Sequence, residues 1–229
     1  MSTYVLTGAG SGIGRLVAER LHARGDTLIL IARDDRRAAD LTAAFPGAVA
    51  VARDLADPTA LADAVAAALP EAIDGIVHAA GIVELGTVAE LPVDAWTSQL
   101  TVNLVAPAEL TRLLLPRVRA ARGQVVFVNS GAGLTAHAGW AAYAASKHGL
   151  KALADALRSE EAEHGVRVTT VYPGRTATPM QETVHAQEGA AYDPDRWIDP
   201  ESVATVILTA LDLPRDAVIS DLTVRPGPR

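Results

Sequence analysis

Tyr143 and Lys147 stand four residues apart in the stretch GWAAYAASKHGL, with only small residues between them. On a helix such a pair projects from one face, with Cβ atoms about 5–6 Å apart. A positive charge near a phenol favours the ionised form and moves its pKa from about 10 toward neutrality. A tyrosine tuned in this way can give a proton to a carbonyl oxygen or take one from an alcohol. The pair therefore predicts general acid–base chemistry, for which other residues must supply the partners.

A hydroxyl and an amide can complete this set. Ser130 follows the apolar run QVVFVN, which is typical of a buried strand. The carboxyl ends of parallel strands face the crevice where ligands bind, so we expect the Ser130 hydroxyl to hydrogen-bond a substrate oxygen as charge develops there. Asn103 lies in the helix-like stretch WTSQLTVNLVAPAEL, where an asparagine by itself is only a mildly unfavourable residue.

The elements that must position these residues alternate along the chain. Short runs rich in Val, Ile and Leu are continuously apolar, as expected for strands buried on both faces. Helix-like stretches separate them, which predicts an α/β fold with one doubly wound parallel sheet of about seven strands, formed by residues 1–229 as a single domain. The predicted strands are residues 3–7, 27–32, 48–52, 73–78, 124–129, 166–172 and 217–224, and the predicted helices lie near 13–24, 36–44, 58–68, 94–120, 141–163 and 200–212.

The first predicted strand ends in a glycine-rich turn that leads into a helix, Thr7-Gly8-Ala9-Gly10-Ser11-Gly12-Ile13-Gly14. Glycines at such a turn let a pyrophosphate approach backbone N–H groups at a helix N-terminus. The spacing differs from G-x-G-x-x-G, and no Lys-Ser/Thr pair follows as in a Walker A loop. Tight packing of the strand against the helix is the alternative interpretation. The position after the first strand of an alternating chain favours a nucleotide site.

The T-G-x-x-x-G-x-G turn that begins at Thr7, together with Ser130, Tyr143 and Lys147, resembles the short-chain dehydrogenase/reductase family. The resemblance reaches from Thr7 to the last predicted strand and implies a Rossmann-type sheet that binds NAD or NADP. It implies hydride transfer between nicotinamide and a carbonyl or alcohol carbon, without a metal. Tyr143 would act as acid or base, Lys147 would lower its pKa and hold a ribose, and Ser130 would position the oxygen. Asn103 would order a water that links the lysine to solvent.

The end of the second strand selects the cofactor in this family. An Asp as its last residue favours NAD, and a basic residue just after it favours NADP. Here Ala32 takes the place of the acid and Arg33 follows, which favours NADP(H) over NAD(H) because a guanidinium can bind a 2′-phosphate. Two alternatives stay open: Arg33 is a solvated residue of the run RDDRR, or Asp34 or Asp35 reaches a ribose hydroxyl.

Three further segments match cofactor contacts of the family in whole or in part. Asp54-Leu55 corresponds to the acidic position near the adenine, although an Asp there is also a common turn former. His78-Ala79-Ala80-Gly81 matches only the second half of Asn-Asn-Ala-Gly, and we interpret His78 as structural. Pro173-Gly174 and the residues after it resemble P-G-x-x-x-T, with a simple turn and helix cap as the alternative. The implied cofactor-binding residues are Gly8, Ser11, Gly12, Ile13, Gly14, Arg33, Asp54, Leu55, Ala80, Gly81, Tyr143, Lys147, Pro173, Gly174, Thr176 and Thr178.

Residues 173–200 interrupt the alternation with four prolines and two glycines. A connection this long is usually functional, so we expect a substrate lid at about 177–198, with an irregular loop as the alternative. The substrate pocket should form between residues 131–140 and this lid. Its expected apolar and aromatic walls suit a small, mostly uncharged carbonyl compound. The residues expected to line it are His137, Trp140, Met180, Tyr192 and Trp197.

The helices at 94–120 and 141–163 carry apolar or small residues around much of their circumference. Such helices need burial on more than one side, so we predict a homodimer or homotetramer through them. The formal charge of -7 and the absence of a Lys/Arg cluster argue against nucleic acid. The chain has no cysteine, no secretory signal pattern and no apolar run of membrane-spanning length, so a cytoplasmic location is the expectation.

These observations favour an NADP(H)-dependent carbonyl reductase or alcohol dehydrogenase. A cofactor-binding sensor or scaffold without turnover is a second hypothesis. An epimerase or dehydratase on the same scaffold is a third.

Overall fold

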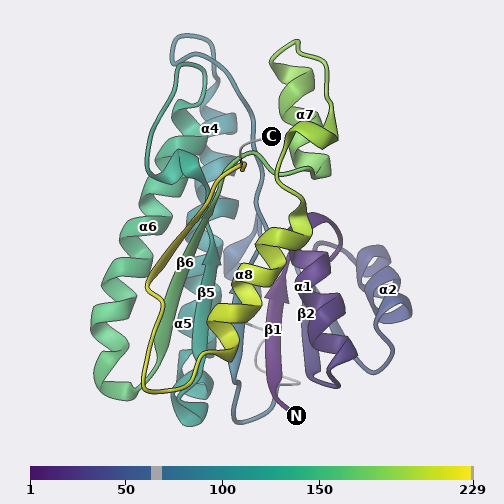
Figure 1. Cartoon of the computed structure of the whole chain (residues 1–229), viewed down its shortest axis with the longest axis vertical. Coiled ribbons are helices and arrows are strands. Elements are labelled where there is room, and N and C mark those ends of the chain that lie inside the picture. The colour runs from purple at the N-terminus through teal and green to yellow at the C-terminus, as the bar shows by residue number, and fades with distance from the viewer. Residues whose placement is uncertain (63–68, 228–229) are drawn as a thin grey trace.

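The computed structural model describes residues 1–62 and 69–227 and contains one seven-stranded sheet with helices on both faces (Figure 1). The strand order is β3-β2-β1-β4-β5-β6-β7, and every neighbouring pair is parallel. The predicted doubly wound fold is thus confirmed. The strands are β1 Thr3–Thr7, β2 Thr27–Ala32, β3 Val49–Ala52, β4 Gly75–His78, β5 Gln124–Val128, β6 Arg167–Pro173 and β7 Asp221–Val224. The α-helices are α1 Gly12–Ala23, α2 Asp35–Ala44, α4 Val93–Leu100, α5 Ala106–Ala121, α6 Ala141–Glu161, α7 Pro179–Gln187 and α8 Pro200–Asp212.

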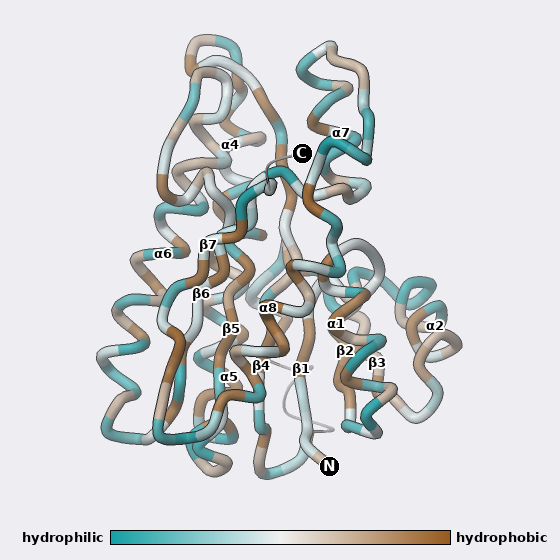
Figure 2. The backbone as a smooth tube through the Cα atoms, viewed as in Figure 1, coloured by the Kyte–Doolittle hydropathy of each residue, from teal (hydrophilic) through white to brown (hydrophobic). Residues whose placement is uncertain are grey.

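The central strands are buried along their whole length. Every residue of β4 and β5 is buried, and Figure 2 shows the corresponding hydrophobic colour along the middle of the sheet. This burial on both faces explains why their sequences are continuously apolar. The edge strands β3 and β7 are only partly covered, and β7 begins at Asp221, later than the predicted start at residue 217.

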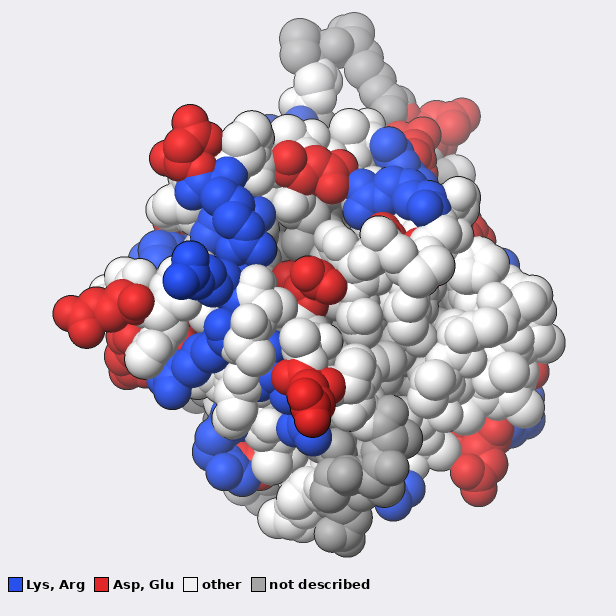
Figure 3. Space-filling model, turned by 90° about the horizontal axis from the view of Figure 1, so that it is seen from below, with Lys and Arg blue, Asp and Glu red and all other residues white. Residues whose placement is uncertain are grey.

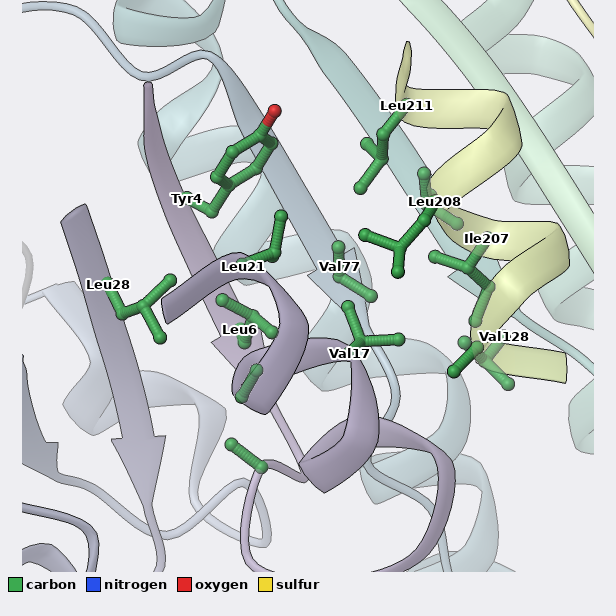
Figure 4. Close-up of a cluster of buried hydrophobic side chains, with 14 of the residues drawn as sticks. Tyr4, Leu6, Val17, Leu21, Leu28, Val77, Val128, Ile207, Leu208 and Leu211 are labelled. Atoms are coloured by element: carbon green, nitrogen blue, oxygen red, sulfur yellow. The ribbon is translucent and has the colours of Figure 1, made fainter. Parts of the chain in front are cut away.

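Two apolar layers hold the helices on the sheet. On one face, Val17 and Leu21 of α1 and Ile207 of α8 pack over Leu6 and Val77 of the sheet (Figure 4). On the other face, α5 and α6 cover the sheet with an equally buried set that includes Leu110, Leu114, Leu150 and Leu157. Each fully buried side chain of this kind stabilises the fold by about 1.5–3 kcal/mol. The sheet is therefore a rigid platform for whatever lies at its rim.

The predicted helix over residues 94–120 is interrupted once. Its parts are α4, a π-helical turn at Thr101–Val105, and α5, which follow one another without a break. A π-turn holds one extra residue and opens the helical hydrogen-bond ladder, and such turns occur frequently at functional sites. Asn103 lies inside this turn.

No helix was predicted within residues 173–200, and this was wrong for α7, although a helix cap after Pro173-Gly174 was the alternative interpretation. Thr178 precedes α7, and its hydroxyl accepts a hydrogen bond from the Gln181 N–H at 3.4 Å. Pro179 occupies the first helical position, where its missing N–H costs nothing. The segment Thr-Pro-Met-Gln is thus a helix start with a capping pattern. The prolines and glycines of residues 173–200 suggested a loop and made this helix start difficult to recognise.

Two other expectations concern the described ranges. The predicted helix near 58–68 begins with a 3-10 turn at Pro58–Ala60, and residues 63–68 lie outside the described residues. Within residues 1–62 and 69–227, no helix combines the length and the apolar character needed to cross a bilayer.

Candidate active site

A cavity of about 1040 Å³ opens at the carboxyl edge of the sheet, at the upper limit of the roughly 300–1,000 Å³ usual for ligand sites. It runs from the β2–α2 connection across the β1–α1 turn to α6 and α7. All the residues implied to bind the cofactor line it: Gly8, Ser11, Gly12, Ile13, Gly14, Arg33, Asp54, Leu55, Ala80, Gly81, Tyr143, Lys147, Pro173, Gly174, Thr176 and Thr178. Ser130 also lines it, and Asn103 lies just behind its wall.

The glycines of the β1–α1 turn have different reasons to lack a side chain. A Cβ at Gly8, whose φ is +74°, would lie 2.7 Å from backbone atoms of Ala79 and Ala80. A Cβ at Gly14 would lie 2.4 Å from the carbonyl oxygen of Gly8. These two positions are set by packing. Gly10 lines the cavity with nothing within 4 Å of its Cβ position, so packing does not explain it. The turn thus fits a ligand that approaches the backbone closely at the start of α1.

The Thr7 hydroxyl joins the ends of β1 and β4. It accepts hydrogen bonds from the N–H groups of Ala79 at 3.2 Å and Ala80 at 3.1 Å. The strand order reverses between these two strands, and ligands of such sheets bind in the crevice at that point. Thr7 therefore fixes the two loops that form the floor of the cavity.

Lys147 is a buried cation on α6. Its side chain lies 5.8 Å from the ring centre of Tyr143, on the same helix face as the spacing predicted. Its Nζ donates a hydrogen bond to the Val128 carbonyl at 3.1 Å. Because burial disfavours the charged form, the pKa of Lys147 is lowered to about 8.

The Tyr143 phenol differs from expectation in the direction of its pKa. The sequence predicted a pKa moved toward neutrality by Lys147, but burial raises the pKa of Tyr143 to about 12 in this ligand-free protein. A hydrogen bond with Ser130 acts in the lowering direction but is the smaller effect. The prediction was wrong for the free protein because burial of the phenol, which the sequence does not reveal, is the largest effect on its pKa.

Ser130 sits between β5 and a 3-10 turn, Gly131–Gly133. Its hydroxyl accepts a hydrogen bond from the Ala132 N–H at 3.1 Å. The preceding residue, Asn129, was missed by the sequence analysis. Its amide donates to the Lys147 carbonyl at 3.0 Å and accepts from the Ser130 N–H at 2.8 Å. Asn129 thus holds the serine and the lysine-bearing helix in register.

Asn103 is buried and fully engaged. Its amide exchanges two 2.9 Å hydrogen bonds with the backbone of Ile82 and donates a third to the Ser146 hydroxyl at 3.0 Å. The Cβ position of Gly81 lies 3.2 Å from Asn103 Oδ1 and 3.7 Å from Lys147 Nζ. The asparagine, the glycine and the lysine therefore form one continuous wall, and the π-turn directs the amide toward it.

His78 is a structural residue, as interpreted from the sequence. Its ring is buried and stacks on Phe127 at 4.9 Å between centroids, and Nε2 hydrogen-bonds the Thr111 hydroxyl at 2.9 Å. Burial lowers the pKa of His78 to about 3. The imidazole is therefore neutral and lies behind the cavity wall, outside its lining.

One end of the cavity is basic. Arg33 and Arg37 both line it, and the Arg33 side chain is 66% exposed. Asp34 does not line it, because its carboxylate caps α2 by accepting from the Arg37 N–H at 2.8 Å. Arg37 escaped the sequence analysis, although its position in the first turn of α2 could have placed it near Arg33. Asp54 lines the same end and also caps a local turn through the Ala56 N–H at 2.9 Å.

The other end of the cavity faces α7. His137, Trp140 and Met180 line it as predicted, whereas Tyr192 and Trp197 do not. The rings of Tyr192 and Trp197 pack on His185 of α7, with centroids 5.3 and 5.2 Å away. These two aromatics thus stabilise the lid itself. The β6–α7 connection also contributes Arg175, which the sequence analysis did not single out.

A seven-stranded parallel sheet with a glycine turn after β1 and a Ser–Tyr–Lys set at its carboxyl edge defines a dinucleotide-dependent oxidoreductase of the Rossmann class. The family profile described as short chain dehydrogenase matches residues 2–189. The chain belongs to the short-chain dehydrogenase/reductase family.

Similar proteins agree with this assignment. The 1-deoxy-11-beta-hydroxypentalenate dehydrogenase of Streptomyces exfoliatus is 35% identical over 234 residues, which cover 96% of this chain and 83% of that protein. A short-chain dehydrogenase from Streptomyces avermitilis has a TM-score of 0.83 at 30% identity, covering 97% and 87% of the two chains. A protein described as a short chain dehydrogenase from Escherichia coli, complexed with NADPH, has a TM-score of 0.85 at 27% identity, covering 98% and 97%.

The buried Lys147 predicts a specific pH dependence of stability. Below pH 8 Lys147 is protonated in both the folded and the unfolded protein, so the folded protein bears the full cost of the buried charge. Between about pH 8 and 10.5 the unfolded state binds more protons, and the free energy of unfolding therefore rises with pH. The free energy of unfolding rises by about 3 kcal/mol in total, because the pKa of Lys147 is lowered from 10.5 to about 8 on folding.

Urea denaturation of the wild type and Lys147→Met between pH 7.5 and 10 measures this effect. The stability advantage of the Met variant should shrink as the pH rises through this window. Tyr143 is present in both proteins, so its own effect, which begins near pH 10 where the unfolded phenol ionises, is common to the two pH profiles. Parallel pH profiles for the two proteins would show that Lys147 is not a buried, depressed cation.

Proposed function

We propose that the protein is an NADP(H)-dependent oxidoreductase that transfers a hydride between nicotinamide and the carbon of a small carbonyl or alcohol substrate. The observation that carries the proposal is the convergence of Ser130, Tyr143 and Lys147 on the same cavity as the glycine turn. Neither tight packing nor a chance Tyr–Lys pair explains that convergence. The site residues inferred from the sequence take their roles within this proposal.

The loop from Gly8 to Gly14 would hold the pyrophosphate at the start of α1, and Thr178 lies against it, 3.2 Å from the Cβ position of Gly12. Lys147 would hold the ribose, and the Pro173-Gly174 segment would meet the carboxamide. A nicotinamide cofactor bound there supplies the hydride donor or acceptor. The protein's part is to orient the reactants and to handle the proton.

Tyr143 is the proposed acid and base. When a carbonyl carbon is reduced, negative charge develops on its oxygen, and the phenol gives that oxygen a proton; in the oxidative direction the phenolate removes one. Ser130 is the proposed hydrogen-bond donor to the same oxygen. For Tyr143 to act near neutral pH, its pKa must fall from the raised value of the free protein, and the Lys147 ammonium is the group proposed to lower it in the assembled site. Asn103 is proposed to keep the lysine in contact with solvent protons.

NADP(H) is the proposed cofactor because the guanidinium groups of Arg33 and Arg37 line the cavity where β2 ends, and the last residue of β2 is Ala32 instead of an acid. Arg33 and Arg37 can share a 2′-phosphate through charge-assisted hydrogen bonds. The Asp34 carboxylate already caps α2 and pairs with Arg33 at 3.4 Å, which leaves it poorly placed for a ribose hydroxyl.

The relative from Streptomyces exfoliatus is a dehydrogenase of a hydroxylated carboxylate by its name, which agrees with chemistry between an alcohol and a carbonyl. We propose the same reaction class here, and the cytoplasmic location remains a prediction. Residues 177–198 are the proposed lid of the single domain, because Met180 and Gln181 of α7 line the cavity.

Homo-oligomerisation through α4, α5 and α6 is also a proposal. Part of the apolar surface that suggested it is used within the chain, since Leu104 lies against Gly149, whose Cβ position is 2.6 Å from its side chain. Val93 and Val105 remain exposed, at 73% and 48%. Large apolar residues exposed on this helical segment favour a self-association surface.

Tyr143→Phe tests the proposed acid. The variant loses the phenolic oxygen but keeps the ring, so NADPH oxidation with a panel of ketones and aldehydes should fall by at least about a hundredfold. NADPH binding, followed by the fluorescence of the bound cofactor, should persist. Undiminished turnover in the Phe variant would contradict the assignment. Cofactor binding without turnover by the wild type would favour the sensor hypothesis.

Arg33→Ser and Arg37→Ser test the cofactor preference. Each should raise the KM for NADPH about tenfold or more and change the KM for NADH little, because only the phosphate contact is lost. Arg36→Ser is the matched control, an exposed arginine of the same run that does not line the cavity. A wild type that prefers NADH would overturn the role given to Arg33.

Light scattering coupled to size-exclusion chromatography tests the assembly. We expect a dimer or tetramer at micromolar concentration, and Val93→Lys with Val105→Lys should shift it toward monomer, because two lysines cannot be buried unpaired in an interface. A wild type that is monomeric throughout would reject the proposal.

A further inference from the structure

Arg225 reaches the cavity from the C-terminal segment, at the end away from Arg33. It follows β7, and the backbone on both sides of it is anchored on the turn after β6. The Val224 carbonyl accepts a hydrogen bond from the Gly174 N–H at 2.8 Å, and Pro226 Cδ lies 3.3 Å from the Cβ position of Gly174. Arg225 is therefore held at the cavity although it lies close to the end of the chain.

The guanidinium of Arg225 lies beside the reacting centre. A Cβ built on Gly131 would lie 2.7 Å from Arg225 Nη1, so the guanidinium rests where that side chain would be. Gly131 directly follows Ser130, the proposed hydrogen-bond donor to the substrate oxygen. Arg225 lines the same cavity as Ser130 and Tyr143.

The charge at this end of the cavity is not balanced. Among the described residues that line the cavity, the only carboxylates are Asp40 and Asp54, which lie with α2 and β3 at the Arg33 end. Arg175 lies near the substrate end but is neutralised by Glu188, through two contacts of 2.7 and 2.6 Å. Trp140 and Trp197 flank its guanidinium at 5.8 and 5.3 Å. Arg175 thus serves the wall and the lid, and Arg225 is left as the guanidinium without a carboxylate partner at this end.

The arginines at the opposite end of the molecule behave differently. Figure 3 shows a band of basic side chains at the end where the strands begin. There Arg119 pairs with Glu161 at 2.6 Å, and Arg167 and Arg215 donate to backbone carbonyls. These arginines complete the fold. Across residues 1–62 and 69–227, no hydrogen bond or ion pair of the Arg225 side chain is observed.

We propose that Arg225 binds a carboxylate of the substrate, so that this enzyme acts on oxo acids or hydroxy acids. The proposal rests on the oxidoreductase function above and differs from the expectation of a mostly uncharged substrate. A guanidinium presents two parallel N–H donors that match a carboxylate, and the pair orients the substrate as well as binding it. In a chain of net charge -7, a local positive site also draws an anion toward the cavity.

Matched acids and esters test the proposal. The substrates are 4-oxopentanoate, 5-oxohexanoate and benzoylformate, each compared with its methyl ester in NADPH oxidation. For at least one pair, the wild type should favour the acid in kcat/KM by about tenfold to a hundredfold, the usual range for a hydrogen-bonded charge pair. Arg225→Gln should bring the acid-to-ester ratio near one, mainly through the KM of the acid. Arg225→Lys should retain an intermediate ratio.

Two further variants separate the charge from its position. Gly131→Ala keeps the arginine but occupies the place of its guanidinium, so the acid-to-ester ratio should fall there too. Arg196→Gln removes an exposed lid arginine that does not line the cavity, and its ratio should equal that of the wild type. Thermal unfolding and NADPH binding of each variant show whether it is folded.

Binding measured without turnover makes the two proposals separable. With the Tyr143→Phe variant loaded with NADPH, the change in cofactor fluorescence reports whether each acid binds more tightly than its ester. Esters reduced as well as acids, or an acid preference that survives Arg225→Gln, would overturn the carboxylate site while the oxidoreductase stands. Arg225-dependent binding of the acids, with no reduction of any acid or ester by the wild type, would support the site and count against the proposed reaction. Failure of every acid both to bind and to react would overturn the site.

Discussion

The arrangement of the site depends on a single buried ammonium group. Lys147 is 4% exposed, and its Nζ hydrogen-bonds one backbone carbonyl, that of Val128 at the end of β5. A buried cation is costly unless polar groups replace water around it, so α6 must stay in register with β5. Asn129 enforces the same register from the other side by bonding the Lys147 carbonyl. These two hydrogen bonds between α6 and the end of β5 fix the positions of Ser130 and Tyr143.

The shape of the cavity depends on glycines, which carry no side chain. Gly8 and Gly14 let the first turn pack against its neighbours, Gly81 leaves room between Asn103 and Lys147, and Gly131 leaves room for a guanidinium. Glycines thus line the cavity together with Trp140 and Met180, while most of the bulky apolar side chains form the two layers beneath it. This division separates stability from chemistry: the sheet and its helices supply a rigid base, and the rim remains open to ligands.

Much of the fold could be predicted because buried parallel strands leave a clear apolar signature, and the central strands were placed within a residue or two. The proposed catalytic set followed from local spacing and from the family resemblance. The features that the sequence analysis missed depend on contacts between distant segments. Asn129 and Arg225 belong to no sequence motif, and the raised pKa of Tyr143 comes from burial. The helix α7 was missed for a different reason, since its capping signal was present among prolines that suggested a loop.

The π-turn at Thr101–Val105 changes how α5 is rotated about its axis relative to α4. An α-helix advances about 100° per residue, so one additional residue rotates everything beyond it by more than a quarter of a circle. The faces of α4 and α5 are therefore out of phase, and a single amphipathic pattern cannot describe both. A regular helix through this segment would be better hydrogen-bonded, yet it would turn either the Asn103 amide from the cavity or Leu110 and Leu114 from the sheet. The π-turn lets the Asn103 amide face the cavity wall while Leu110 and Leu114 pack on the sheet, which a regular helix could not do at once.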